Sequence, residues 1–114
     1  MAMRYHLRLP ESDRARGSDP AFAFRSHSAE GIAAELQDAL RTEALFQRWR
    51  DAQEDPDAVD PALGATDPGA TVQGAQRDLH AELVVTTSLP GSLLRQRLRL
   101  LAGNQWELRD VSAA

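Results

Sequence analysis

The sequence contains no cysteine and no lysine, so all 13 of its basic residues are arginine. Without cysteine, the chain has no disulfide framework, no thiolate nucleophile and no cysteine-ligated zinc or iron–sulfur site. Without lysine, it has no amine for Schiff-base chemistry and no P-loop lysine. These two absences exclude much covalent and cofactor chemistry, and we expect no cofactor.

Long hydrophobic runs are also missing, and no stretch approaches the ~18 consecutive apolar residues of a membrane span. The first residues contain no apolar run followed by a small-residue cleavage site, so we expect no secretory signal. Exclusive use of arginine suggests a GC-rich bacterial genome. The sequence therefore predicts a cytoplasmic bacterial protein with no membrane partner.

The charge is acidic overall, with a net value of −4. Residues 51–78 carry seven acidic side chains and one arginine, so the other segments are slightly basic in sum. Nucleic-acid binding domains are usually strongly basic, at least on one face. We therefore expect no nucleic-acid partner. The G-x-S-x-G, G-x-G-x-x-G and GK[ST] motifs are absent, which leaves hydrolase, dinucleotide and P-loop functions without support.

With 114 residues, the chain has room for one domain, residues 1–114, and one core. Residues 54–75 contain three Asp-Pro pairs and little periodicity, which predicts a long acidic loop. Within it, Asp60 can cap one short helical turn that begins at Pro61.

Strict alternation of apolar and polar residues over 3–9 predicts a half-buried first strand. Residues 21–26 repeat the alternation with Phe22 and Phe24 on one face, which predicts a second strand in a hairpin with the first. From Ser28 the period becomes helical. The apolar stripe changes phase after Arg41, so we expect a break near Thr42 and a second helix to about Gln53.

The second half of the chain reads as strand, helix, strand. Residues 78–87 predict a central strand with Leu79, Ala81, Leu83 and Val85 inward. Residues 92–102 alternate Arg with Leu and Gln, but they contain no β-branched or aromatic residue and are followed by Gly103, which favours a helix. Arg95, Arg97 and Arg99 then fan around a solvated face. Residues 105–111 predict a last strand with Trp106 and Leu108 inward.

These elements follow the order ββα(α)βαβ. Helices with one apolar face pack on one side of a sheet, so the order predicts an α+β two-layer sandwich. Its sheet has about four strands, mainly antiparallel. The layout is related to ferredoxin-like folds, a likeness that carries no function by itself.

The sheet face opposite the helices collects the polar residues of the strands. His6, His80 and Glu82 are candidate catalytic residues there, because imidazole titrates near neutral pH and a carboxylate can orient it. No metal-binding spacing is present, so no metal is expected. No Phe, Tyr or Trp is expected on this face, which argues against base stacking. The candidate ligand or partner residues are Arg4, Arg8, Arg25 and Arg109.

Two functions remain open. The first is a non-enzymatic interaction or regulatory module that binds a protein partner, or itself as a homodimer, through the open sheet face. The apolar patch from Leu45 to Trp49 is a second possible interface, or a core patch under the long loop. The alternative function is a small anion-binding sensor or enzyme that uses His80 or His6 with arginines of the sheet face.

Overall fold

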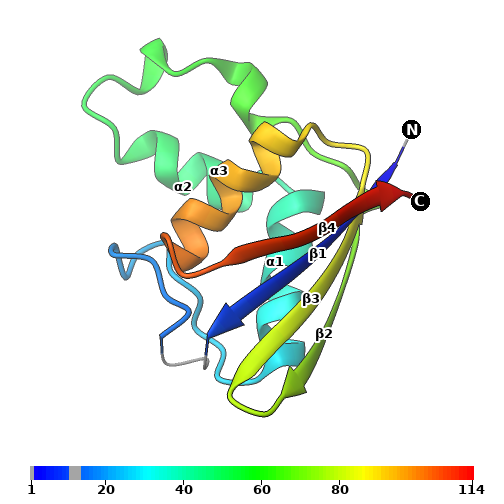
Figure 1. The fold of residues 1–114 in the computed structure, drawn as a ribbon. Helices are drawn as coiled ribbons and strands as arrows, with labels where there is room; N and C mark the ends of the chain where they lie inside the picture. The colour runs from blue at the N-terminus through cyan, green and yellow to red at the C-terminus, as the bar shows by residue number, and fades with distance from the viewer. Residues whose placement is uncertain (1, 11–13) are drawn as a thin grey trace.

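A four-stranded antiparallel sheet forms one layer of the described structure, and helices cover one of its faces (Figure 1). This computed structural model describes residues 2–10 and 14–114. The strands are β1 (Met3–Pro10), β2 (Thr71–Arg77), β3 (His80–Thr87) and β4 (Glu107–Ala113). The helices are α1 (Ala29–Arg41), α2 (Ala44–Asp51) and α3 (Gly91–Ala102), and two short 3₁₀ turns follow α2 at Pro56–Ala58 and Pro61–Gly64.

The strands lie in the order β2-β3-β1-β4, and each adjacent pair is antiparallel. β1 and β2 flank β3 and are joined through α1, whereas β3 and β4 flank β1 and are joined through α3. The fold therefore consists of two interleaved β-α-β units. The predicted α+β class is confirmed, but the predicted element order is wrong at two places.

One core lies between the sheet and the helices. Alternate residues of β1 and β3 point into it, and the α1 stripe predicted from Ser28 onward packs against them. Each fully buried aliphatic side chain contributes about 1.5–3 kcal/mol relative to exposure. The main contributors are Leu7, Leu9, Leu83, Val85, Ile32, Leu36, Leu40 and Leu98.

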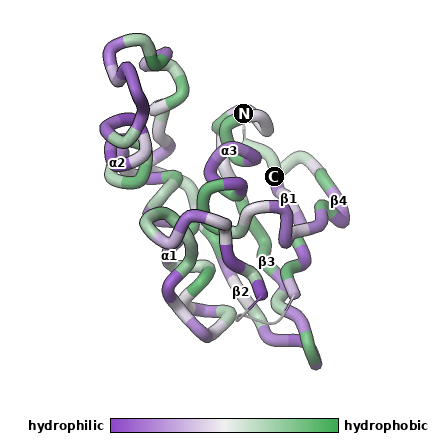
Figure 2. The backbone as a smooth tube through the Cα atoms, turned by 90° about the vertical axis from the view of Figure 1, so that its left-hand side faces the viewer, coloured by the Kyte–Doolittle hydropathy of each residue, from purple (hydrophilic) through white to green (hydrophobic). Residues whose placement is uncertain are grey.

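The predicted break between α1 and α2 is confirmed. The Ser28 side chain accepts from the Gly31 amide and caps α1, and the chain becomes extended at Thr42. α2 then turns its apolar residues to a different part of the molecule. Leu45 joins the core, and the ring of Phe46 packs directly on Gly64 of the long loop. Figure 2 shows α2 and this loop at one end of α1, away from the sheet. The Leu45 to Trp49 patch is thus largely buried.

The predicted strand over 21–26 is wrong, because these residues form turns and irregular backbone. Phe22 and Phe24 are nevertheless buried, as their alternation suggested. The Phe24 amide donates to the Leu101 carbonyl at 2.9 Å, and the Arg16 guanidinium donates to the Phe24 and Ser26 carbonyls. The segment is therefore held against the end of α3 instead of entering the sheet.

The second strand of the chain is instead β2, most of which lies within the residues 54–75 predicted as loop. Its apolar signal is weak because α1 approaches it very closely. A Cβ atom at Gly74 would lie 2.3 Å from the Ala29 carbonyl oxygen. Small residues are needed there, and only Val72 among the β2 side chains is buried.

β2 and β3 are joined by a tight turn, and this turn corrects the predicted start of the central strand. Asp78 has φ of +53°, and Leu79 is 72% exposed instead of facing inward. The remaining inward residues of β3 are buried, and β3 is an internal strand as predicted.

The predicted helix over 92–102 is confirmed as α3, and Gly103 follows it with φ of +62°. The expected fan of solvated arginines is wrong for Arg97. Its side chain is 1% exposed, and Nη2 donates to the Ala65 carbonyl of the long loop at 2.9 Å. Burial lowers the pKa of this guanidinium.

Asp67 anchors the end of the long loop beside β3. Its carboxylate accepts from the Thr87 hydroxyl at 2.8 Å and from the Ser88 amide at 2.9 Å. The backbone hydrogen bond from Ser88, followed by bonds from Thr87 and Gly69, holds the pKa of this carboxyl below its ordinary value. Asp60 accepts from the Ala62 amide, so the predicted helical turn at Pro61 is confirmed.

Candidate functional site

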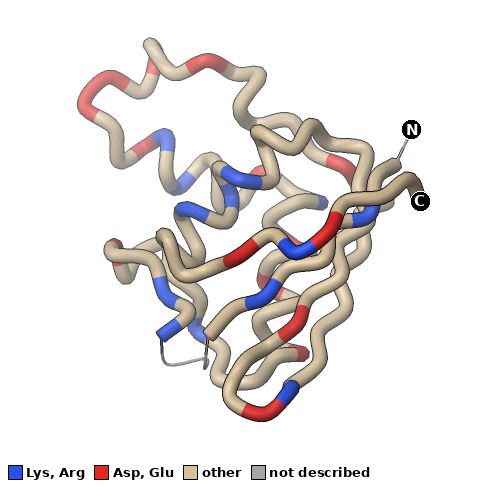
Figure 3. The backbone as a smooth tube through the Cα atoms, viewed as in Figure 1, with Lys and Arg blue, Asp and Glu red and all other residues tan. Residues whose placement is uncertain are grey.

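The open face of the sheet brings together six of the seven predicted site residues. β1 places three of them on this face in alternation, β3 supplies two and β4 one. Figure 3 shows both signs of charge along these strands, with acidic residues more frequent in the loop after α2. The six residues are Arg4, His6, Arg8, His80, Glu82 and Arg109.

Arg25 does not belong to this group. Because residues 21–26 form no strand, Arg25 lies in the segment before α1, and its amide donates to the Glu35 carboxylate at 3.0 Å. Its side chain is exposed near α1 and α2, on the helical side of the molecule. The prediction that Arg25 shares a surface with Arg8 is therefore wrong.

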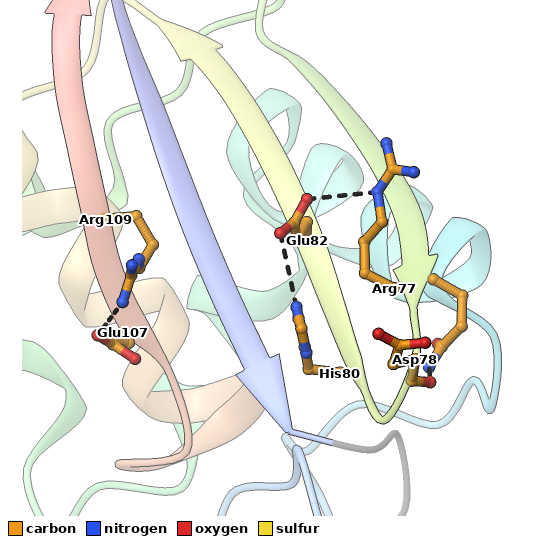
Figure 4. A network of polar contacts seen from close by, with 7 residues as sticks. Arg77, Asp78, His80, Glu82, Glu107 and Arg109 are labelled. Carbon is orange, nitrogen blue, oxygen red and sulfur yellow. Dashed lines mark hydrogen bonds and ion pairs between the residues drawn. The ribbon is translucent and has the colours of Figure 1, made fainter.

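Most charges on the open face lie close to an opposite charge (Figure 4). Glu82 lies 3.5 Å from Arg77 Nε and 3.5 Å from His80 Nε2. On β4, Arg109 Nη1 donates to Glu107 at 2.8 Å. Exposed pairs of this kind stabilise by at most about 1 kcal/mol. They do, however, leave the face nearly balanced in charge.

The pairing of His80 with Glu82 provides an imidazole beside a carboxylate, as a general base requires. The side-chain hydroxyls that donate hydrogen bonds within the described residues, those of Thr42 and Thr87, bond to Asp38 and Asp67 and not to His80 or His6. The same described residues contain no group of three His, Asp or Glu side chains placed to hold a metal ion. Nor do they include a helix with the length and apolar character needed to cross a membrane.

The outer edge of β4 is the feature that the sequence reading missed. β4 pairs with β1 on one side only, and almost all of its side chains are exposed. Leu108 faces the helix-covered side of the sheet as predicted, but it remains 38% exposed, and Val111 is 44% exposed. Both line an apolar groove of about 200 Å³ beside α3. The remaining lining residues include Tyr5, Leu7, Leu94, Leu98 and Trp106.

A bulge in β4 explains why these two residues share a face. Leu7 pairs with Leu108 and His6 with Asp110, which leaves Arg109 as the extra residue. In an unbroken strand, residues three apart point to opposite faces. An apolar pair at a spacing of three within a strand is the sequence signal that would have indicated the bulge.

Comparison of the chain with protein-family models, with curated proteins and with solved structures finds no match. The arrangement of residues is therefore the basis for the proposals that follow.

Proposed function

We propose that this protein is a small interaction module without catalytic activity, and that it self-associates as a homodimer through the outer edge of β4. One observation carries the proposal: an edge strand with two exposed apolar side chains borders an apolar groove. Unpaired strand edges readily add another strand. Exposed apolar surface next to such an edge favours that addition.

The residue order of β4 is self-complementary, which favours a second copy of the chain as the occupant. In a two-fold symmetric antiparallel pair, Leu108 of one copy lies opposite Val111 of the other, and Arg109 lies opposite Asp110. Each contact occurs twice. The bulge at Arg109 keeps Leu108 and Val111 on the helix-covered face and Asp110 on the open face, so the pairing matches side chains on both faces.

The open sheet face contributes to this association at its border with β4. Asp110 pairs with His6 across the strands, and Arg109, Asp110 and His6 line one shallow depression of the open face. Their charges set the register more than they add affinity. A single added strand buries less area than a standard stable interface, so we expect a dissociation constant in about the micromolar to millimolar range.

We further propose that the sheet order and the two β-α-β units make this a ferredoxin-like fold, with α2 and the acidic loop inserted between α1 and β2. We also propose, from the sequence, that the protein is bacterial and cytoplasmic.

Charge exchange across the edge tests the register. By sedimentation velocity at protein concentrations up to about 1 mM, wild type should show a concentration-dependent dimer. In R109D, an introduced aspartate faces Asp110 of the other copy at both symmetric contacts, so the dimer should be lost. In D110R, two arginines face each other in the same way, and the dimer should again be lost. The double variant R109D/D110R restores opposite charges and should dimerise again.

The matched control is Gln73→Asp on β2, at the other edge of the sheet, which should leave the dimer intact. A wild-type chain that stays monomeric throughout would refute self-association. Dimers that survive in both R109D and D110R would place the interface elsewhere.

A further inference from the structure

We propose that a second surface of the protein, a hollow at the end of the sheet, binds a small oxyanion such as a carboxylate or phosphate group. The hollow holds about 300 Å³ where β1 ends and β3 begins, and the segment between α3 and β4 forms its other wall. It adjoins the apolar groove and shares Trp106 with it, but its polar lining residues do not line that groove. Different variants therefore test anion binding and self-association. Its polar lining includes Arg8, His80, Asn104 and Gln105.

Arg8 is the principal cation of this hollow, and no charge of the described residues pairs with it. In the sheet register it lies between Glu82 of β3 and Glu107 of β4. Those carboxylates, however, lie against Arg77, His80 and Arg109, and no acidic group of the described residues lies within ion-pair distance of Arg8. Its Nε atom is buried and has no hydrogen-bond partner. A buried N–H donor without an acceptor is costly, and a bound anion would supply one.

His80 provides a second unsatisfied nitrogen on the same side of the sheet. Its Nε2 atom is buried without a hydrogen bond, because the 3.5 Å separation from Glu82 is too long for a good one. His80 pairs with Pro10 and Glu82 pairs with Arg8, so His80 and Arg8 are diagonal neighbours on one face. An unsatisfied guanidinium N–H of Arg8 and an unsatisfied ring nitrogen of His80, from adjacent strands, therefore border the same hollow.

The segment after α3 adds neutral groups that suit an anion. Asn104 and Gln105 follow the left-handed Gly103, and their exposed amides provide N–H donors at the rim. The half-buried Trp106 forms an apolar wall, and its indole N–H is already bonded to the Gly103 carbonyl at 3.0 Å.

The chemistry selects an anion over a cation. The guanidinium carries donors and no acceptor, the imidazole and the two side-chain amides can each add an N–H donor, and a guanidinium can bind a carboxylate or phosphate with two parallel hydrogen bonds. Among the described residues that line the hollow, the one carboxylate is that of Glu107, and Arg109 holds it at 2.8 Å. The size of the hollow limits the ligand to a small molecule or to the charged end of a larger one.

The test is NMR titration of the isotope-labelled chain with sodium phosphate and, separately, sodium acetate, at constant ionic strength set with sodium chloride. We expect saturable shifts of the His80 ring and of the Asn104 and Gln105 side-chain amides with at least one of the two anions. Arg8→Gln should weaken that binding about tenfold or more, as the loss of one charge-assisted pair predicts.

Arg4→Gln is the matched control, because Arg4 lies on the same strand and face but does not line the hollow. It should bind as wild type does. Asn104→Ala, outside the sheet, should weaken binding while the strands stay intact, and it replaces R8Q if that variant does not fold. The proposal is overturned if neither anion gives saturable shifts at these residues. It is equally overturned if R8Q or N104A binds as tightly as R4Q.

Discussion

The two edges of the sheet differ in what lies beside them. At the β2 edge, α1 packs so closely that Gly74 has no room for a side chain. Gln37 of α1 accepts the Val72 amide at 3.0 Å, and Arg41 donates to the Ala70 carbonyl at 2.6 Å. At the β4 edge, no helix within residues 2–10 and 14–114 provides such contacts, and the side chains of Leu108 and Val111 remain partly exposed. One edge is covered by contacts with α1, and the other is the edge at which we propose self-association.

The largest expected effect follows from breaking the closed edge. Gly74→Val introduces a Cβ atom 2.3 Å from the Ala29 carbonyl oxygen, and neither backbone can move without disturbing the pairing of β2 with β3. We expect the free energy of unfolding to fall by about 3 kcal/mol in urea denaturation. Ser112→Val, on β4, should change it by less than about 0.5 kcal/mol. Equal losses for the two variants would show that the edges do not differ in this way.

A smaller effect is expected at the anchor that leads the chain into β2. Asp67→Asn weakens the charge-assisted bonds to Thr87 and Ser88 and should cost about 1–2 kcal/mol at neutral pH. The pKa of Asp67 is lowered in the folded state, so its contribution is complete above the unfolded value and is lost as pH falls through the folded value.

The stability difference between wild type and D67N, measured by urea denaturation at several acidic pH values, should therefore shrink as pH falls below the ordinary range for aspartate. Asp57→Asn, in the exposed part of the same loop, should show no such trend. A difference between wild type and D67N that does not vary with pH would argue against an ionised anchor.

The smallest effect on folding is expected at the open edge. Val111→Ser replaces an apolar side chain that is already 44% exposed with a polar one, so the free energy of unfolding at low protein concentration should change by about 0.5 kcal/mol. Association at high concentration should nevertheless be lost. A loss of stability as large as that of Gly74→Val would mean that Val111 belongs to the core and that the β4 edge is closed.

The sequence predicted the elements whose hydrophobic period is strong. β1, α1 and α3 combine clear periodicity with capping residues such as Ser28 and Gly103, so local and tertiary preferences agree. The alternation at Phe22 and Phe24 correctly predicted that both side chains are buried. A spacing of two residues is not unique to strands, however, because two buried residues of an irregular segment can have it as well. β2 escaped detection for the opposite reason, since the close approach of α1 requires small residues that erase the alternation.

The candidate site was predicted to a similar extent. Strand alternation placed Arg8, His80 and Glu82 on one face without knowledge of strand order. The exposure of Leu108 could not be predicted from the sequence, because it depends on which strand lies at the edge of the sheet. The burial of Arg97 depends on the path of the long loop, which no local pattern specifies.

The central position of β1 also has a consequence for how the chain acquires its structure. Both neighbours of β1 are encoded far downstream: Pro10 pairs with His80, and Met3 pairs with Ala113. During synthesis, the first strand therefore leaves the ribosome without a pairing partner and must wait until most of the chain has followed. Long-range pairing of this kind slows folding and prolongs the exposure of apolar strands. We therefore expect β1 to stay unpaired longer than β2 and β3, which pair with each other across a tight turn.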